Sequence, residues 1–391
     1  MDPDLSALDA YLDDRDTDGY LIDADSEDSD QYYLSGFDAP DPFVTLYDGE
    51  THLLFPRSLE YGRATREARA QSVQRYVDFD HAELVEEFGP EEAVSHVLAA
   101  FCESYDVESV AVPPRFPLKT ADSLRARGVE VTADTDGIVT EIRATKTDEE
   151  VEHVRTAQRA NEVSMAAAEE LLGDASVADD GTLEYEGEAL TSERVKEEIE
   201  VTLLRHGCSL DETIVACGSD AADPHDRGSG PLSADEPIIV DIFPQDKATK
   251  YHADMTRTFC VGDPSETVQE WYDLTERAMD AAFDALEPGA TGQDVHDAVC
   301  EVYEDAGMAT LRSDDRTETG FIHSTGHGVG LDVHELPRLS PAGGELEPGH
   351  VVTIEPGLYD PAVGGVRIED IAVVTEDGYE NLTDYEKRLV V

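Results

Sequence analysis

Five side chains in the C-terminal part of this chain are of the types that bind divalent metal ions. They are two aspartates, one histidine and two glutamates: Asp241, Asp254, His327, Glu355 and Glu369. Four carboxylates and one imidazole make an oxygen-rich set that suits ions such as Mn²⁺, Co²⁺ or Zn²⁺. Two such ions about 3.5–4 Å apart can generate a hydrolytic nucleophile from water at neutral pH. The residue types therefore indicate a dinuclear metal-dependent hydrolase.

The two aspartates adjoin segments that have the pattern of strands. Asp241 ends the apolar run 237–240, and Asp254 comes directly before residues 255–259. A carboxylate is rarely buried in such a place unless it is paired or binds a metal. The pair alone means little, because 89 of the 391 residues are acidic. With this context, we expect an antiparallel hairpin closed by the polar loop 244–250.

The two glutamates have a matching arrangement. Glu355 follows the run 351–354, Glu369 lies in 366–370, and residues 361–365 form the turn between them. We expect a second hairpin here. Two hairpins that face each other would place all four carboxylates around one site.

Histidines cluster around the fifth candidate ligand. Glycines at 326, 328 and 330 surround His327 and let the backbone take tight conformations near a ligand. His323 and His334 lie in the same stretch, so that three of the 12 histidines fall within 323–334. A single Gly-His-Gly usually marks a turn, but three histidines so close together indicate a functional site rather than a core.

The order of elements in the C-terminal part predicts an internal two-fold repeat. We expect two helices followed by strands, and then the same order again, with two candidate ligands in the first half and three in the second. The predicted helices are 151–172, 193–206, 267–286 and 292–305, and the predicted strands are 213–217, 238–243, 255–261, 351–359 and 365–375.

Residues 1–145 show short apolar strands that alternate with amphipathic stretches. The predicted strands are 19–22, 43–47, 52–55, 107–112 and 129–131, and the predicted helices are 91–104 and 120–127. This alternation predicts a separate α/β domain with its own core. It has no cluster of histidines, cysteines or carboxylates on neighbouring strands, so we expect no catalytic role for it. The charged segment 146–150 marks the boundary with the second domain, 146–391.

The chain carries a formal net charge of −61, from 89 acidic and 28 basic residues, of which only 6 are lysines. Such a field repels nucleic acid and anionic membranes, so we expect neither as a partner. The acidic residues are spread along the chain and 40% of its residues are hydrophobic, which argues against a disordered acidic tail. At molar ionic strength the Debye length falls to about 3 Å and the self-repulsion is screened. The composition therefore predicts an extreme halophile as the source.

Cysteine usage and the N-terminus suggest a soluble, cytoplasmic protein. The five cysteines form no CxxC pair, so we expect reduced thiols. The first residues lack the basic and apolar segments of a signal peptide. No uninterrupted apolar run approaches 18 residues, the length that a membrane-spanning helix needs.

Together these motifs resemble the pita-bread metallopeptidase family, which includes Xaa-Pro aminopeptidases, Xaa-Pro dipeptidases (prolidases), methionine aminopeptidases and the metal-free creatinases. The resemblance covers essentially the whole chain and rests on His323…His327-Gly328-Val329-Gly330…His334-Glu335-Leu336-Pro337, Glu355-Pro356-Gly357 and Arg367-Ile368-Glu369-Asp370. It implies an α+β fold, in which a smaller creatinase/prolidase-like α/β domain precedes a pita-bread catalytic domain. That second domain would have a pseudo-two-fold repeat and an antiparallel sheet flanked by helices.

The resemblance also implies a ligand set and an assembly. Two divalent ions, with manganese favoured over cobalt and zinc, would be held by Asp241, Asp254, His327, Glu355 and Glu369. The second aspartate and the second glutamate would bridge the two ions. Arg367 would hold a ligand carboxylate in place. A homodimer is the expected assembly.

Catalytic roles follow from the same resemblance. Glu355 would act as general base and then as general acid. His323 and His334 would donate hydrogen bonds to the oxygen that becomes negatively charged in the reaction. His225 and His334 would contact the substrate.

Three departures from the family pattern are visible. The two aspartates are usually two residues closer together, and the family has glycine where this chain has Phe243. An insertion of two residues is even, so both side chains can stay on one face of the hairpin. Asp220 stands where relatives often have asparagine, before His225. All five ligands are present, which argues against a metal-free reaction.

The implied reaction is hydrolysis of the N-terminal Xaa-Pro bond in short peptides with proline at the second position. Methionine aminopeptidases usually lack the N-terminal domain. Arg338 stands where the dipeptidases of the family often carry an arginine for the substrate carboxylate, which favours dipeptides. If Arg338 is only a surface residue, an aminopeptidase for longer peptides is the alternative. A non-peptidase binding protein on this fold is a third possibility, but such proteins commonly lose ligands.

The charge predicts how stability depends on salt. Removing salt strengthens both ion pairing and like-charge repulsion, because the Debye length grows from about 3 Å at 1 M to about 10 Å at 0.1 M. With only 28 basic residues against 89 acidic ones, repulsion should win and the melting temperature should fall. Added Mn²⁺ should restore part of the loss by binding only the folded state. Thermal unfolding from molar KCl down to 0.1 M tests this, and a melting temperature that stays flat or rises would contradict it.

Overall fold

The computed structural model describes residues 3–210 and 212–391, so that positions 1, 2 and 211 lie outside the described residues. The chain divides into two compact units, Met1–Arg143 and Ala144–Val391. The division falls two residues before the boundary expected from the sequence. None of the helices in the described ranges has the length and apolar composition needed to cross a bilayer.

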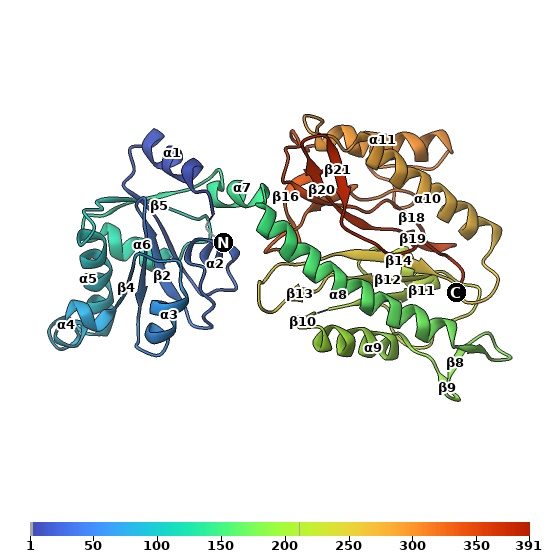
Figure 1. The fold of residues 1–391 in the computed structure, drawn as a ribbon, viewed down its shortest axis with the longest axis horizontal. Helices are drawn as coiled ribbons and strands as arrows, with labels where there is room; N and C mark the ends of the chain where they lie inside the picture. The colour runs from blue at the N-terminus through green and yellow to red at the C-terminus, as the bar shows by residue number, and fades with distance from the viewer. Residues whose placement is uncertain (1–2, 211) are drawn as a thin grey trace. The chain divides into compact units, whose positions relative to one another are not determined.

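The first unit is built on a six-stranded mixed sheet with the order β4-β3-β2-β1-β5-β6 (Figure 1). Its strands are β1 (Gly19–Ala24), β2 (Phe43–Tyr47), β3 (Thr51–Phe55), β4 (Ser72–Arg75), β5 (Ser109–Val112) and β6 (Glu130–Ala133). Its helices are α1 (Ser6–Asp14), α2 (Ser29–Ser35), α3 (Tyr61–Glu67), α4 (His81–Phe88), α5 (Pro90–Glu103), α6 (Leu118–Arg125) and α7 (Ile138–Ala144), with a 3₁₀ turn at Tyr76–Phe79. Every residue of β2 and β3 is buried, because the chain covers both faces of the sheet there. The expected α/β domain is confirmed.

The second unit has the expected repeat of two helices followed by strands. The first half contains α8 (Asp148–Gly173), α9 (Ser192–Arg205), β11 (Ile214–Cys217), β12 (Ile238–Ile242) and β14 (Met255–Phe259). The second half contains α10 (Glu266–Ala285), α11 (Gly292–Asp305), β15 (Gly326–Gly328), β16 (Glu335–Leu339), β17 (Val351–Ile354), β18 (Gly357–Asp360), β19 (Gly364–Arg367), β20 (Asp370–Thr375) and β21 (Gly378–Asn381). Shorter pieces are β7 (Ser176–Val177), β8 (Leu183–Tyr185), β9 (Glu188–Ala189), β10 (Cys208–Ser209), β13 (Gln245–Asp246) and the 3₁₀ helix η2 (Gly218–Ala222).

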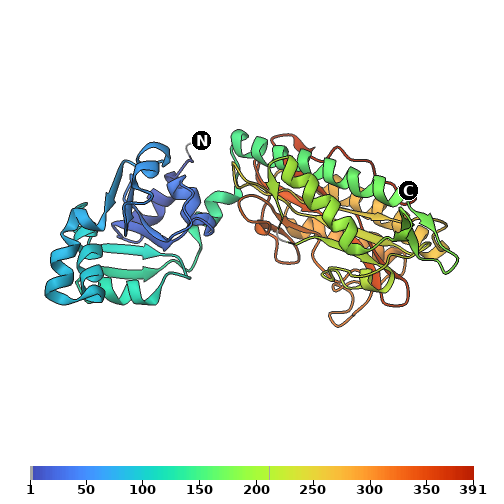
Figure 2. The ribbon, with the colours of Figure 1, turned by 90° about the horizontal axis from the view of Figure 1, so that it is seen from below.

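The strands of this unit lie between two helix pairs. Figure 1 shows α8 and α9 along one side of the strands and α10 and α11 along the other, and Figure 2 shows α8 and α9 side by side. β11, β12 and β14 form one antiparallel sheet, and the larger sheet has the order β16-β15-β17-β20-β21. Each half has its own apolar core, one under α8 and α9 and one under α10 and α11.

Helix α8 begins three residues earlier than its apolar pattern predicts. The side chain of Thr147 accepts a hydrogen bond from the Glu150 N–H, and the Glu150 carboxylate accepts from the Thr147 N–H. This capping box satisfies the first free N–H groups of the helix, so the charged residues 148–150 form its first turn.

The expectation of single strands over 351–359 and 365–375 is wrong. The first is interrupted at Glu355 and Pro356, and the second at Ile368 and Glu369. Pro356 has no N–H to donate to a ladder. Glu369 N–H donates to the Thr256 carbonyl at 3.0 Å, on β14, instead of to its own hairpin. The strands therefore break at the residues that the sequence marks as ligands.

Candidate metal centre

The first hairpin presents both aspartates on one face. Asp241 on β12 lies directly across from Thr256 on β14. The same register continues beyond the strand ends, because Gln245 bridges to His252, and it places Phe243 across from Asp254. Residues 254 and 256 share a face because side chains alternate along a strand. The longer loop therefore leaves the side-chain parity of the two aspartates unchanged, as expected for an even insertion.

The second hairpin places the two glutamates opposite each other. β17 pairs with β20 and β18 with β19, and both ladders have one common register. That register sets Glu355 across from Glu369 at the point where both strands are interrupted. The expected hairpin is confirmed, although its two arms are broken.

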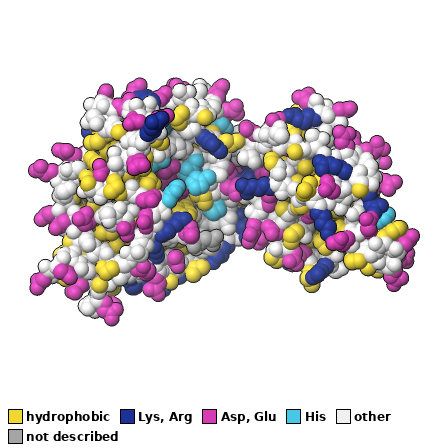
Figure 3. All heavy atoms as spheres, turned by 180° about the vertical axis from the view of Figure 1, so that it is seen from behind, with side chains coloured by type: hydrophobic (Ala, Val, Ile, Leu, Met, Phe, Trp, Pro, Cys, Tyr) yellow, Lys and Arg dark blue, Asp and Glu magenta, His cyan; other side chains and the backbone are white. Residues whose placement is uncertain are grey.

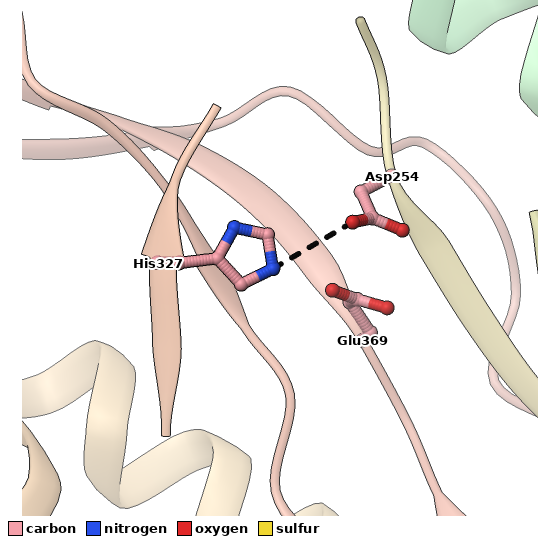
Figure 4. A group of neighbouring side chains, drawn as sticks. All are labelled: Asp254, His327 and Glu369. Carbon is pink, nitrogen blue, oxygen red and sulfur yellow. Dashed lines mark ion pairs between the residues drawn. The ribbon is translucent and has the colours of Figure 1, made fainter. Parts of the chain in front are cut away.

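Hydrogen bonds between the hairpins bring the four carboxylates together. Thr256 Oγ1 donates to Glu369 Oε2 at 2.7 Å, next to the backbone bond between the same two residues. Ligand atoms of Asp254, His327 and Glu369 all lie within 4.8 Å of one another (Figure 4). His327 Nε2 is 3.7 Å from Asp254 Oδ2 and 3.6 Å from Glu355 Oε1.

His327 offers a free lone pair to this cluster. Its Nδ1 lies 3.1 Å from the Gly328 carbonyl, which can only accept, so Nδ1 carries the proton. Burial lowers the pKa of His327 to about 3, so the ring is neutral at neutral pH. Nε2, which points at the carboxylates, is then unprotonated and can bind a metal ion.

Arg367 holds the remaining carboxylate. Its Nη2 donates to Asp241 Oδ2 at 2.8 Å, its Nη1 to Tyr359 OH at 2.9 Å, and its Nε to Thr256 Oγ1 at 3.1 Å. The other oxygen, Asp241 Oδ1, is buried and has no hydrogen-bond partner among the residues that the structure describes. A buried carboxylate oxygen without a partner is costly unless a cation binds it.

The electrostatics also fit cations. Burial raises the pKa of Asp254, Glu355 and Glu369, and neighbouring carboxylates raise it further. Such groups stay ionised together only if positive charge lies among them. The four carboxylates and His327 Nε2 therefore fit a pair of divalent ions, and the hardness of this donor set suits Mn²⁺, Co²⁺ or Zn²⁺.

His323 interacts with Tyr359. Its Nδ1 lies 2.7 Å from the Ser324 carbonyl and must be the protonated nitrogen, and burial lowers the pKa of His323 to about 3. Nε2 therefore accepts from Tyr359 OH, at 3.0 Å. Both ring nitrogens are occupied within the protein, so the expected donation from His323 to the substrate is not available in this arrangement.

The other candidate substrate residues are exposed on the second unit, where histidine side chains gather in Figure 3. The ring of His334 is 4.2 Å from that of His327, centre to centre. His225 is exposed and lies in the loop after η2. Loss of hydration lowers the pKa of His334, and its electrostatic interaction with His225 lowers it further. Arg338 on β16 pairs with His327 on β15, and its side chain is exposed. The fold thus brings His225, His334 and Arg338 near the candidate metal ligands.

The sequence analysis assigned no role to several residues that build the centre: Thr256, Arg257, Tyr359 and Asp370. Thr256 and Tyr359 are described above. Arg257 is fully buried, and it donates to the Glu369 carbonyl at 2.7 Å and to Asp370 Oδ1 at 2.8 Å. Strand parity with Asp254 could have indicated Thr256. The long-range partners of the other three could not be read from local sequence.

Family models match both units of this chain. Residues 152–376 match the model of metallopeptidase family M24, and residues 5–145 match the creatinase/prolidase N-terminal domain. The chain is 29% identical over 392 residues to the Xaa-Pro dipeptidase of Pyrococcus furiosus, with 99% of each chain covered.

Solved structures show the same architecture. The prolidase of Pyrococcus horikoshii OT3 superposes with a TM-score of 0.79 at 26% identity, covering 98% of this chain and 99% of the other. The X-Pro aminopeptidase of Thermotoga maritima has a TM-score of 0.78 at 24% identity, covering 96% and 98%, which shows a shared fold. With its family-model match, its two-domain architecture and its carboxylate-rich site, the chain belongs to metallopeptidase family M24 and carries a creatinase/prolidase-type N-terminal domain.

Proposed function

We propose that this metallopeptidase hydrolyses the N-terminal Xaa-Pro bond of short peptides and prefers dipeptides. The observation that carries the proposal is the cluster of Asp254, Glu369 and the neutral His327, with Glu355 and Asp241 beside it, in a family M24 fold. A relative that matches over nearly the whole chain is an Xaa-Pro dipeptidase, which supports this substrate class.

Different side chains have different roles in the proposed reaction. When bound, a pair of divalent ions lowers the pKa of water and polarises a carbonyl oxygen. Glu355 would take a proton from the attacking water and deliver it to the leaving proline nitrogen. His334 would donate to the oxygen that gains negative charge. The Tyr359–His323 hydrogen bond keeps Tyr359 OH, which also accepts from Arg367, in place beside the site.

Arg338 supports the preference for dipeptides. Cross-strand partners project from the same face of a sheet, so the pairing with His327 directs Arg338 to the side of the ligands. An exposed guanidinium there can bind a carboxylate with two parallel hydrogen bonds. Only a dipeptide carries its free carboxylate on the residue next to the cleaved bond.

An aminopeptidase for longer Xaa-Pro peptides is the second candidate. The fold is shared with an X-Pro aminopeptidase of Thermotoga maritima, so the fold does not discriminate between the two substrate classes. A binding protein without peptidase activity is disfavoured, since all five candidate ligands are present and converge. Manganese as the metal used, a homodimer, a halophilic source and the cytoplasm remain part of the proposal.

Glu355→Gln should lower turnover of an Xaa-Pro dipeptide by orders of magnitude, because it removes a charged ligand and the group that carries the proton. The fold should be kept, since glutamine has nearly the same shape. Steady-state kinetics in molar KCl with each of Mn²⁺, Co²⁺ and Zn²⁺ measures this. Glu345→Gln, at an exposed position of the same unit, is the matched control. Near-wild-type turnover in Glu355→Gln would rule out the assignment.

Arg338→Ala should weaken the binding of dipeptides far more than the binding of Xaa-Pro-Yaa tripeptides. A charge-assisted hydrogen bond contributes about 1.5–3 kcal/mol, which is about 10- to 150-fold in apparent affinity. Arg316→Ala, at an arginine of the same unit whose side chain is 91% exposed, is the control. Kinetics with matched di- and tripeptides give the answer. Equal losses for both lengths would make Arg338 structural and favour the aminopeptidase.

A further inference from the structure

The charged segment that opens the second unit, residues 146–150, reaches two loops of the metal centre. We propose that Lys146 and Glu150 are positioning residues, Lys146 for His334 and Glu150 for Asp254. The proposal rests on the proposed function for the role of His334. Its structural basis is a set of buried contacts that join the start of α8 to both loops.

Both the backbone and the side chain of Lys146 are held by hydrogen bonds. Its N–H donates to the Gly349 carbonyl at 2.9 Å, and its Nζ donates to the Ala144 carbonyl at 3.2 Å. A Cβ on Gly349 would lie 2.8 Å from the Lys146 carbonyl oxygen, so the two backbones are in close contact. Nζ also forms an ion pair with Glu335, and the two side chains are 1% and 2% exposed.

The Glu335 carboxylate lies under the turn that carries His334. Asp332 N–H donates to Glu335 Oε2 at 3.4 Å. A Cβ on Gly330 would lie 2.2 Å from Glu335 Oε1, so only glycine leaves room for the carboxylate there. The turn 330–335 therefore closes around a group that Lys146 holds, and His334 is the residue directly before Glu335.

Glu150 holds the other loop. Its Oε2 accepts from Thr147 in the capping box, which leaves Oε1 to accept from Tyr251 OH at 2.6 Å. Tyr251 is buried and precedes Asp254 by three residues. His252 N–H donates to the Gly330 carbonyl at 2.7 Å and joins the two loops. The N-terminus of α8 thus contacts both the loop that carries Asp254 and the turn that carries His334.

The energetics favour positioning over stabilisation. The desolvation cost of a buried ion pair can exceed its Coulombic gain, and apolar replacements of such pairs are often neutral or stabilising. The Lys146–Glu335 pair has a defined geometric consequence instead, because it fixes the turn before His334. Outer contacts of this kind typically affect metal affinity or activity by about 10- to 100-fold.

A double-mutant cycle between Lys146→Met and His334→Ala tests the first arm. Lys146→Met alone should lower kcat/KM by about 10- to 100-fold with the bound-metal stoichiometry unchanged. In the His334→Ala background it should cost much less, since the residue that it positions is gone. Equal fold losses in both backgrounds would overturn the Lys146 arm. If Lys146→Met does not fold, Glu335→Gln takes its place in the same cycle, with the same two outcomes.

Tyr251→Phe tests the second arm without any substrate. It removes the hydroxyl that donates to Glu150 and leaves the capping box intact, and it should weaken Mn²⁺ binding about 3- to 10-fold in calorimetric titrations of metal-stripped protein. Tyr385→Phe is the matched control, because Tyr385 OH donates to Glu169 on the same helix α8. Unchanged Mn²⁺ affinity in Tyr251→Phe, or an equal loss in Tyr385→Phe, would overturn this arm. Absence of Xaa-Pro turnover in the wild-type chain would instead overturn the proposed function.

Discussion

The repulsion among four neighbouring carboxylates, three of them buried and that of Glu355 partly buried, is the constraint on which the rest of this structure depends. Two unit charges 4 Å apart interact by about 4 kcal/mol at an effective dielectric constant of about 20. Several such pairs approach the whole free energy of unfolding of a domain, about 5–15 kcal/mol. Arg367 supplies one positive charge at Asp241. The other carboxylates respond with raised pKa values, and divalent cations are the means of keeping them ionised.

The fold accommodates this constraint by distributing the ligands over two hairpins. Each hairpin carries two carboxylates at fixed register, so neither can leave the site unless its strand pairing changes. The interruption of β17/β18 and β19/β20 at Glu355 and Glu369 frees their backbone from the ladder. Buried Arg257 binds both the Glu369 carbonyl and the Asp370 carboxylate, and these contacts fix the backbone between β19 and β20. These contacts hold the repelling groups in place before any cation binds.

The sequence predicts much of the fold, because long amphipathic helices and apolar strands have readable periods. It predicts α11 at its observed bounds and β12 to within one residue. It misses α2 and α3, since seven residues are too few to show a helical period. It also joins β19 to β20, because the backbone hydrogen bond from Glu369 to Thr256, which replaces a bond within this hairpin, depends on a partner 113 residues away.

The candidate site was likewise predicted in part. Residue types and parity bring Asp241 and Asp254 to one face, and the family resemblance supplies the roles of the five ligands. The tautomer of His323 could not be predicted from the sequence, because it depends on the Ser324 carbonyl and on Tyr359 in the folded chain. The contacts of Lys146 and Glu150 could not be predicted either, since a run of charged residues at a domain boundary is usually a solvated surface.

The most direct test of the central claim is the number of divalent ions that one chain binds. Metal-stripped protein in molar KCl would be titrated with Mn²⁺ by calorimetry, and the metal content of the dialysed complex measured by mass spectrometry. The account predicts two ions per chain, with protons released on binding because the raised pKa values fall as the carboxylates gain cations. A chain that binds no ion, or that saturates at one, would contradict it.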